Sequence, residues 1–264
     1  MYYIDYHTHS RCSFDSNAPL THMVRAAQAA GMQELCVTDH CDLVDERGQR
    51  ACAWDWNKSL AQFDDARQKL AREGFTLRLG LEFGMGHLDP PCSRTILSQP
   101  RLDFVIGSIH NYSPKKGSGD FYYADMSTPE ACAAILDDYF FSMEQLVQSP
   151  WFDILGHIIY PLRYMGGNAT IRPWMDRISD IMKTVIDSGR GIEVNTWCGR
   201  TIADWEPVLR RYKDLGGQII TVGSDAHAPA NVGAGIPEAY DLLKSLGFKA
   251  VCIYDKHAPA FIDL

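Results

Sequence analysis

Two histidines, His7 and His9, stand two residues apart at the end of the apolar run "YYIDYH". In an extended strand, residues at this spacing point to the same side, so the two imidazoles can meet at one point in space. This spacing is typical of metal ligands. Hydrogen bonds can also satisfy such a pair, so the metal interpretation depends on whether the rest of the chain supplies further ligands.

Polar residues that could bind a metal or a substrate follow six later apolar runs in the same way. These residues are Asp39, His40, Glu82, His110, His157, Asn195, Asp225 and His227. In a βα barrel the carboxyl ends of all strands open onto one face, where active sites are built. Carboxylates at the mouth of an apolar barrel are costly without counter-ions. We therefore expect a cluster that holds more than one metal ion.

The runs alternate with segments of helical spacing. The predicted helices cover residues 20–30, 59–72, 129–147, 173–188, 206–214 and 237–245. A glycine follows five of the helical stretches as an expected C-cap, at Gly31, Gly74, Gly189, Gly216 and Gly247. Residues 86–101 give no clear helix, residues 113–127 are predicted to be a long loop, and "KAVCIY" forms an eighth run. The alternation predicts a parallel α/β fold that closes, or nearly closes, into one barrel domain over residues 1–264.

Composition limits the classes of partner. A chain of 264 residues with 46% hydrophobic content can bury a full core. The net charge of −8 argues against nucleic acid as the main partner, because Lys and Arg hold phosphate backbones. The sequence shows no signal peptide and no apolar run of membrane-spanning length, so we expect a soluble cytoplasmic protein without a membrane partner. The sequence does not indicate an oligomeric state.

The eight cysteines include no CxxC pair and no compact spacing. In a chain too long to need covalent cross-links, we expect reduced thiols. Cys12, Cys41 and Cys198 lie close to candidate site residues and could serve as ligands, although buried packing is the more common role of such residues.

The motifs "YHTHS", "TDH", "GLEFG", "GSIH", "GH" and "GSDAH" resemble, in this order, the motifs of the PHP (polymerase and histidinol phosphatase) family. The resemblance extends from Tyr6 to His227, and the chain length is similar to that of the stand-alone histidinol-phosphatase branch. It implies a distorted (βα)7 TIM-like barrel of PHP type. It also implies two to three divalent metal ions, which could be Zn, Mn or Fe.

The resemblance assigns ligands to each of the three metals. The first metal would be held by His7, His9, Glu82 and Asp225. Glu82 would bridge to a second metal, completed by His110 and His157. The third would be held by His40, His227 and Asp15, where some relatives have histidine. An oxygen ligand there favours Mn²⁺ or Fe²⁺ slightly over Zn²⁺.

Two aspartates near these ligands have alternative interpretations. Asp15 could instead be a turn or N-cap residue before the first helix. Asp39 is expected to orient a ligating histidine rather than to bind metal itself. The other three histidines, His22, His87 and His257, are expected to be non-ligands.

Two arginines are candidates for binding a phosphoryl group, because a guanidinium matches phosphate geometry. Arg163 and Arg200 each follow a predicted strand on the catalytic face, with Asn195 between them in the sequence. Histidinol phosphatases of the family similarly use arginines in these two loops. A surface salt bridge is the alternative role of either arginine.

The resemblance implies hydrolysis of a small phosphomonoester, with L-histidinol phosphate as the leading substrate. A metal-activated hydroxide in a trinuclear site would attack the phosphorus atom. The residues expected to take part in catalysis are Glu82, Asp225, His227, Arg163 and Arg200.

Three alternatives stay open at this point. A relative of the same family could act on another phosphomonoester, a nucleotide or a phosphodiester. An amidohydrolase-type deaminase or lactonase also begins with HxH, but usually has lysine or a carboxylate where this chain has His110. A non-catalytic, metal-stabilised regulatory module would be expected to lack ligands, whereas this chain has a complete set apart from aspartate at Asp15.

Overall fold

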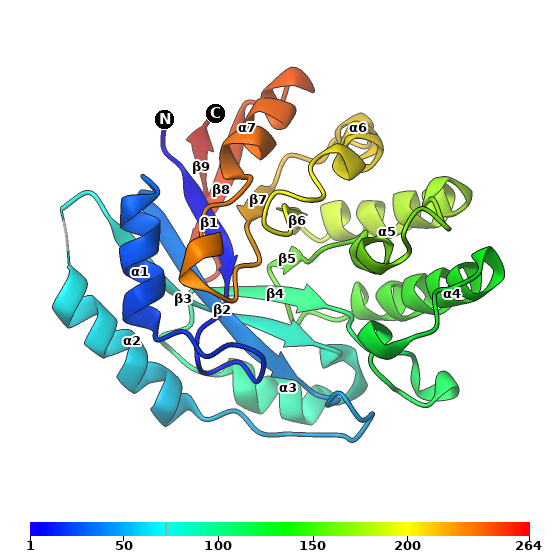
Figure 1. Ribbon diagram of the computed structural model, residues 1–264, viewed down its shortest axis with the longest axis horizontal. Helices are drawn as coiled ribbons and strands as arrows, with labels where there is room; N and C mark the ends of the chain where they lie inside the picture. The colour runs from blue at the N-terminus through cyan, green and yellow to red at the C-terminus, as the bar shows by residue number, and fades with distance from the viewer. Residues whose placement is uncertain (72) are drawn as a thin grey trace.

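Seven parallel strands form one sheet in the order of the sequence (Figure 1). The computed structural model describes residues 1–71 and 73–264. The strands are β1 (Ile4–Thr8), β2 (Glu34–Asp42), β3 (Thr76–Gly84), β4 (Phe104–Ser108), β5 (Ile154–Leu155), β6 (Gly191–Asn195) and β7 (Ile220–Gly223). Just beyond the end of β7, the Asp225 N–H donates to the carbonyl of His7 at 2.8 Å, and the His9 N–H donates to the carbonyl of Ala226 at 2.9 Å. These bonds bring β7 back to β1, so the barrel is nearly closed.

A helix follows each barrel strand, and the helices surround the sheet in Figure 1. They are α1 (Leu20–Ala29), α2 (Trp56–Leu70), α3 (Pro90–Leu97), α4 (Pro129–Leu146), α5 (Met175–Asp187), α6 (Glu206–Asp214) and α7 (Ile236–Ser245). All six predicted helices are confirmed, although the predicted end of the second, Arg72, lies outside the described residues. All five predicted C-cap glycines have φ between 73° and 87°, in the left-handed region. Four of them, Gly31, Gly189, Gly216 and Gly247, directly follow the C-cap residue of a helix. The prediction is wrong for Gly74, because α2 already ends at Leu70 with Ala71 as its C-cap.

The strands are buried because helices cover the sheet on the outside and side chains fill it on the inside. Inside the barrel, Tyr6 packs edge-to-face on Phe104 with ring centroids 5.1 Å apart. The Tyr6 hydroxyl donates to Glu34, which also pairs with Arg78 at 2.9 Å. Since Glu34 is the first residue of β2, this polar cluster lies at the amino end of the barrel, away from the predicted site.

Two segments differ from the sequence prediction. Residues 90–97 form α3, where no clear helix was expected; Asp89 caps it by accepting from the Cys92 N–H at 3.0 Å, and Pro90 occupies its first turn. The run "KAVCIY" gives β8 (Ala250–Asp255), which lies outside the barrel sheet. It pairs antiparallel with β9 (Ala258–Asp263), a strand that the sequence analysis did not predict. The predicted loop 113–127 contains two short 3₁₀ turns.

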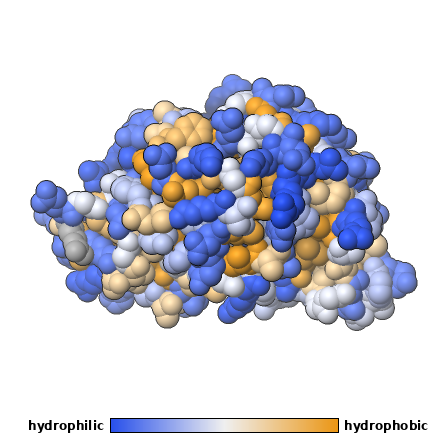
Figure 2. All heavy atoms as spheres, turned by 90° about the horizontal axis from the view of Figure 1, so that it is seen from above, coloured by the Kyte–Doolittle hydropathy of each residue, from blue (hydrophilic) through white to orange (hydrophobic). Residues whose placement is uncertain are grey.

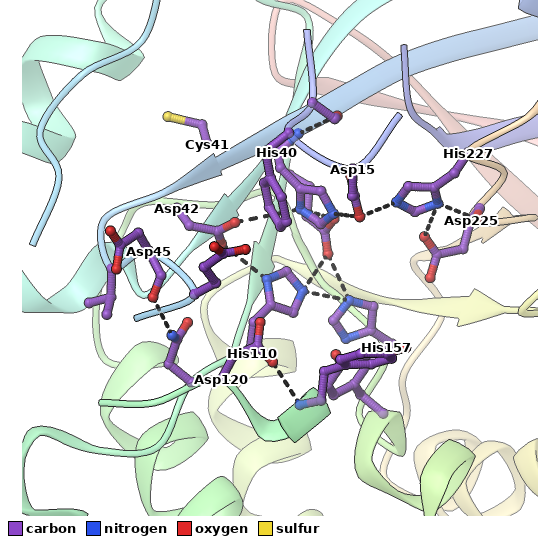
Figure 3. Close-up of a pocket in the computed structure, with 18 of the residues that line it drawn as sticks. Asp15, His40, Cys41, Asp42, Asp45, His110, Asp120, His157, Asp225 and His227 are labelled. Carbon is purple, nitrogen blue, oxygen red and sulfur yellow. Dashed lines mark hydrogen bonds and ion pairs between the residues drawn. The ribbon is translucent and has the colours of Figure 1, made fainter. Parts of the chain in front are cut away.

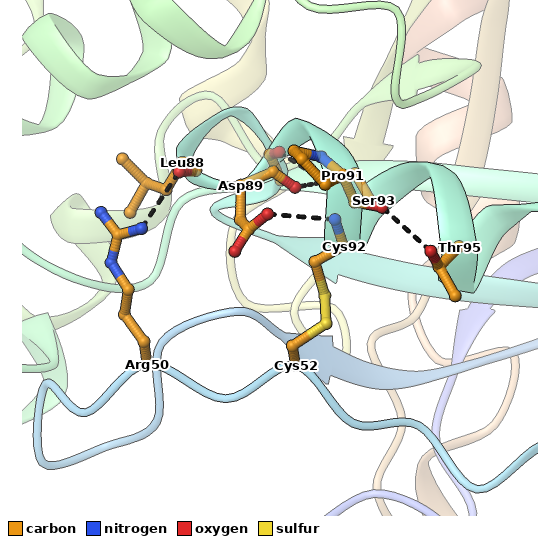
Figure 4. Close-up of a disulfide and its surroundings, with 9 residues drawn as sticks. Arg50, Cys52, Leu88, Asp89, Pro91, Cys92, Ser93 and Thr95 are labelled. Carbon is orange, nitrogen blue, oxygen red and sulfur yellow. Dashed lines mark hydrogen bonds between the residues drawn. A yellow bond between two sulfur atoms is a disulfide. The ribbon is translucent and has the colours of Figure 1, made fainter.

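A disulfide joins Cys52, in the loop after β2, to Cys92 in α3 (Figure 4). The prediction that all eight cysteines are reduced thiols is therefore wrong for these two, and the other six are free. The pair was not predicted because its members are 40 residues apart in the sequence and only the fold brings their Cα atoms to 5.9 Å. The bond fixes the loop after β2 to the loop-and-helix unit after β3.

Hydrophilic residues cover much of the face shown in Figure 2, with apolar residues exposed between them. Within the described part of the chain, no helix is both long enough and apolar enough to cross a membrane.

Candidate metal centre

Glu82 lies at the centre of the predicted ligands. It belongs to β3, next to His40 on β2 in the strand register, and its side chain is fully buried. Its Oε1 atom is 2.7 Å from His157 Nε2 and 3.0 Å from His110 Nε2. Its Oε2 atom is 3.1 Å from His7 Nε2. The two carboxylate oxygens therefore face two different groups of histidines, as a bridging ligand must.

The first group consists of His7, His9, Glu82 and Asp225. Asp225 Oδ1 is 3.3 Å from His9 Nε2 and 3.5 Å from His7 Nε2. Although they are buried, His7 Nε2, His9 Nε2 and Glu82 Oε2 have no hydrogen-bond partner. Buried polar atoms without partners are rare and costly. Imidazole nitrogens and carboxylate oxygens that converge in this way fit a divalent metal ion.

The third predicted group also comes together. Asp15 Oδ2 is 3.0 Å from His227 Nε2 and 3.5 Å from His40 Nε2 (Figure 3). Asp15 is not the N-cap of the first helix, because α1 begins after Pro19. The Asp15 side chain is 36% exposed, so this group is more open to solvent than the first.

Three of the six candidate histidine ligands, His7, His9 and His227, contact a supporting group through Nδ1, their second ring nitrogen. His7 Nδ1 is 2.6 Å from Glu193 Oε1, and His9 Nδ1 is 3.1 Å from Ser13 Oγ. His227 Nδ1 is 3.0 Å from the carbonyl oxygen of Asp225. Such partners fix the ring and its tautomer so that Nε2 faces the metal.

The orienting role predicted for Asp39 is indirect. Its carboxylate accepts from the backbone N–H and the hydroxyl of Ser10 and, at 2.9 Å, from the hydroxyl of Ser13. Ser13 in turn contacts His9. Asp39 therefore fixes the loop that carries His9 and does not contact a histidine nitrogen through its own carboxylate.

The close approach of β7 to β1 depends on Gly223. A Cβ atom at this position would lie 2.3 Å from the Cβ of His7, so any side chain would push the two strands apart. Two residues later, Asp225 has φ of 59°, a left-handed backbone conformation that is uncommon outside glycine. Strained conformations of this kind cluster at functional sites, and here the strain accompanies a carboxylate turned toward His7 and His9.

The carboxylates of the centre are ionised. Burial alone would raise the pKa of Glu82, but the neighbouring His7, His40 and His110 hold it well below its usual value. The pKa of Asp225 is likewise held well below its usual value, because His7 and Arg163 outweigh the effect of burial. Burial and the nearby His227 and His40 lower the pKa of His9 well below its usual value, which favours the neutral imidazole that binds metals.

The two candidate arginines occupy different environments. Arg163 is buried beside the centre, where it donates to Asp225 Oδ2 at 2.8 Å and to Asn195 Oδ1 at 2.6 Å. Arg200 is exposed and lies on the Trp197 ring, with 4.8 Å between the guanidinium carbon and the ring centroid. Arg163 and Asn195 thus lie in the site, whereas Arg200 contacts Trp197 and none of the candidate ligands described above.

A cavity of about 1010 Å³ opens over the candidate ligands. Aromatic side chains form part of its wall, including Phe14, Trp54, Tyr160 and Trp197. Cys12 and Cys41 also line it, but within the described chain no group of converging metal donors includes a cysteine. None of these groups of described residues includes His22, His87 or His257 either.

Sequence analysis missed three functional neighbours of the ligands: Ser13, Glu193 and Asp42. Glu193 could have been found, because it stands two residues before Asn195 on a buried strand and must point to the same side. Asp42 has the same relation to His40 on β2. Ser13 lies in a loop, and nothing in the local sequence indicates its contact with His9.

The fold and the donor set define a metal-binding βα barrel. The family model described as PHP domain matches residues 5–197, which is more than half of the chain. The chain therefore belongs to the PHP domain family.

The curated relatives have the same length. A probable histidinol-phosphatase of Thermotoga maritima is 26% identical over 260 residues, and the alignment covers 96% of each chain. A histidinol-phosphatase of Lactococcus lactis is 26% identical over 270 residues, covering 95% of this chain and 94% of the relative.

Solved structures share the fold. A histidinol phosphate phosphatase from Lactococcus lactis, crystallised with zinc, L-histidinol and phosphate, superposes with a TM-score of 0.80 at 24% identity and covers 98% of each chain. Metal-dependent tyrosine phosphatases of Bacillus subtilis and Streptococcus pneumoniae are represented by a match with a TM-score of 0.51 at 15% identity, which covers 92% of this chain and 86% of the other. The predicted (βα)7 TIM-like barrel of PHP type is confirmed.

Proposed function

We propose that the protein is a metal-dependent phosphatase that hydrolyses a small phosphomonoester, with L-histidinol phosphate as the first candidate. The single observation that carries the proposal is Glu82, whose two oxygens face two groups of imidazoles beside a buried arginine. The relatives named histidinol-phosphatase, which align over nearly their whole length, support the choice of substrate.

The residues that would hold metal ions are those of the three groups described above. They are His7, His9, Asp15, His40, Glu82, His110, His157, Asp225 and His227. Two or three divalent ions bound here would lower the pKa of a coordinated water and neutralise charge on the phosphoryl group. A Zn, Mn or Fe ion suits this mixture of imidazole and carboxylate, and the zinc in the Lactococcus lactis structure favours Zn.

The chain's own residues would position the substrate. A guanidinium has five N–H donors, and the bonds from Arg163 to Asp225 and Asn195 leave further donors for a phosphoryl oxygen. Asn195 also donates to Asp225 Oδ2 at 3.1 Å, so it contacts both Arg163 and the carboxylate with which Arg163 pairs. Tyr160 and Trp197 pack on the Arg163 guanidinium at 5.1 Å and 5.5 Å from their ring centroids, which limits the access of water to it.

A second substrate class has some support from the cavity. Its volume of about 1010 Å³ lies at the upper end of ligand pockets, and the lining residues Phe14, Tyr122 and Tyr123 are exposed. Such a cavity could admit a larger phosphoester, including a nucleotide. Three predictions stay untested: a cytoplasmic location, one domain over residues 1–264, and the absence of nucleic acid as the main partner, which is inferred from the net charge of −8.

The test is release of phosphate from a panel of phosphomonoesters and phosphodiesters by protein loaded separately with Zn²⁺, Mn²⁺ or Fe²⁺. Selective turnover of histidinol phosphate is the expected result. Faster turnover of a nucleotide or a phosphoprotein would favour the larger substrate class. Absence of phosphate release from the whole panel, in protein shown to contain metal, would contradict the proposal.

A further inference from the structure

Asp42 is a carboxylate at the end of β2 that none of the predicted ligand sets includes. It stands two residues after His40, so both side chains leave the strand on the same side. Asp42 Oδ1 is 3.0 Å from His110 Nδ1, and Asp42 Oδ2 is 3.6 Å from His40 Nδ1 (Figure 3). The Asp42 side chain is 11% exposed. It therefore reaches the centre from behind the ring of His110.

The surroundings of His110 determine which of its nitrogens carries the proton. Nε2 of this ring faces the second group of donors, 3.0 Å from Glu82 Oε1 and 3.3 Å from His157 Nε2. A neutral imidazole has one N–H and one lone pair, whereas an ionised carboxylate can only accept. Contact with Asp42 thus places the proton on Nδ1 and turns the lone pair of Nε2 toward the position where Glu82 and His157 converge.

An independent feature of β3 supports a dedicated role for this carboxylate. Gly84 is paired with Asp42 in the register of β2 and β3. A Cβ atom at Gly84 would lie only 1.6 Å from Asp42 Oδ1. Gly84 is part of a regular strand, so the glycine here provides space and not backbone freedom. β3 therefore has no side chain at the position that the Asp42 carboxylate of β2 occupies.

We propose that Asp42 is a positioning residue for the metal centre: it holds His110 in the tautomer and orientation that present Nε2 to a metal shared with Glu82 and His157. The inference rests on the proposed function only through the presence of that metal. Carboxylates that orient ligating histidines typically change metal affinity by about 10–100-fold when they are removed.

The experiment measures zinc affinity by competition with a chromophoric chelator, so it does not depend on turnover. Asp42→Ala is expected to lower the affinity for the zinc ion that His110 would share with Glu82 and His157 by about 10–100-fold. Asp42→Asn is expected to recover part of this loss, because the amide oxygen still accepts from Nδ1–H. Glu46→Gln is the matched control, because it also neutralises a carboxylate in the loop after β2. Among the described residues Glu46 pairs only with Arg47, at 3.8 Å, so this variant should bind zinc as the original protein does.

Gly84→Ala supplies a second test, which does not alter Asp42 itself. The added methyl group should displace the carboxylate and lower zinc affinity to the level of Asp42→Ala. In the Asp42→Ala background the same methyl group has no carboxylate to displace, so the double variant should bind zinc as Asp42→Ala alone does. In ¹⁵N-histidine NMR spectra of the zinc-loaded protein, the Nδ1–H signal of His110 should persist in Asp42→Asn and disappear in Asp42→Ala.

Unchanged zinc affinity in Asp42→Ala, or additive losses in the double variant, would overturn the inference. These outcomes are separable from failure of the proposed function. A protein that hydrolyses no phosphoester but loses zinc affinity in Asp42→Ala retains the positioning role. If the protein is an active phosphatase but its zinc affinity does not depend on Asp42, the positioning role is excluded while the proposed function stands.

Discussion

Arg163 and Arg200 show how far the local sequence determines the role of a residue. Both follow a barrel strand, and the sequence analysis treated them alike. The structure separates them, because Arg163 donates to Asp225 and Asn195 whereas Arg200 is exposed and packs on Trp197. A charge-assisted hydrogen bond contributes about 1.5–3 kcal/mol, and only a buried donor contributes that much without strong screening.

We predict that Arg163→Ala raises KM and the inhibition constant for inorganic phosphate by about 10-fold or more, since about 1.4 kcal/mol corresponds to each factor of ten. Arg200→Ala should change either constant only a few-fold. Steady-state kinetics with phosphate as inhibitor measure both, and metal content must be compared because Arg163 also contacts Asp225. A larger effect of Arg200→Ala would mean that its loop rearranges to reach the substrate.

The candidate ligands could be predicted residue by residue because each one follows a strand, and the barrel brings all strand ends to one face. The side of the strand on which a supporting residue such as Glu193 lies could be predicted from its spacing, but the histidine that it contacts could not. His7 and Glu193 are 186 residues apart and meet only because β1 and β6 are placed by the whole barrel. Asp42 was missed for another reason: next to "TDH" it resembles an ordinary polar residue at a strand end.

At the scale of the element, helix propensity and capping residues predicted six of the seven helices described above but did not predict α3. In α3, two prolines and a cysteine at the start of an eight-residue helix hide the helical period, although Asp89 and Pro90 form a typical N-terminal signal. β9 failed for a different reason, since its side chains are mostly exposed and it shows no buried pattern. Its pairing with β8 compensates for weak local preference.

The disulfide allows a prediction at the same scale. Closing a loop between Cys52 and Cys92 restricts the unfolded chain, so we expect Cys52→Ser/Cys92→Ser to lower the free energy of unfolding by about 2–4 kcal/mol. For a protein of this size the melting temperature should fall by roughly 5–15 °C. Thermal unfolding of the metal-loaded protein, with and without a phosphine reductant, measures the change.

The serine variant itself is the control for the reductant, because it has no such bond to reduce. The reduced original protein should have the same melting temperature as the variant, and the reductant should not lower the melting temperature of the variant further. The loop after β2 also contributes Trp54 and Asp45 to the cavity wall, so the variant should show a higher KM with little change in metal content. Identical melting of oxidised and reduced protein would show that the bond does not constrain the unfolded chain.

At the scale of the whole molecule, the barrel brings carboxylates and histidines together in one cluster. In the metal-free protein, protons on the histidines balance the charge of the carboxylates, and bound metal ions would replace those protons. Burial lowers the pKa of a histidine, but in the metal-free protein the carboxylates Glu82, Glu193 and Asp42 outweigh it. The pKa values of His7, His40 and His110 are therefore raised well above the usual value. Metal ions bind neutral imidazoles, so they must compete with these protons.

This competition sets the sign of the pH dependence. Histidines with raised pKa values stabilise the metal-free fold below about pH 6.5, and this contribution is lost as the pH rises through their folded-state pKa values. Glu82 and Asp225, with lowered pKa values, lose their contribution only in stronger acid. Metal binding strengthens over the same rise in pH, by about 1.4 kcal/mol per pH unit for each proton displaced.

We therefore predict that the difference in melting temperature between zinc-loaded and metal-free protein grows from about pH 5.5 to about pH 8. Calorimetry in buffers of different ionisation enthalpy should also detect protons released when zinc is added. His22→Gln, which changes an exposed histidine on α1, is the matched control and should follow the original protein. A difference that stays constant or shrinks toward high pH would contradict the assignment of these imidazoles as ligands, because zinc would then be binding without displacing their protons.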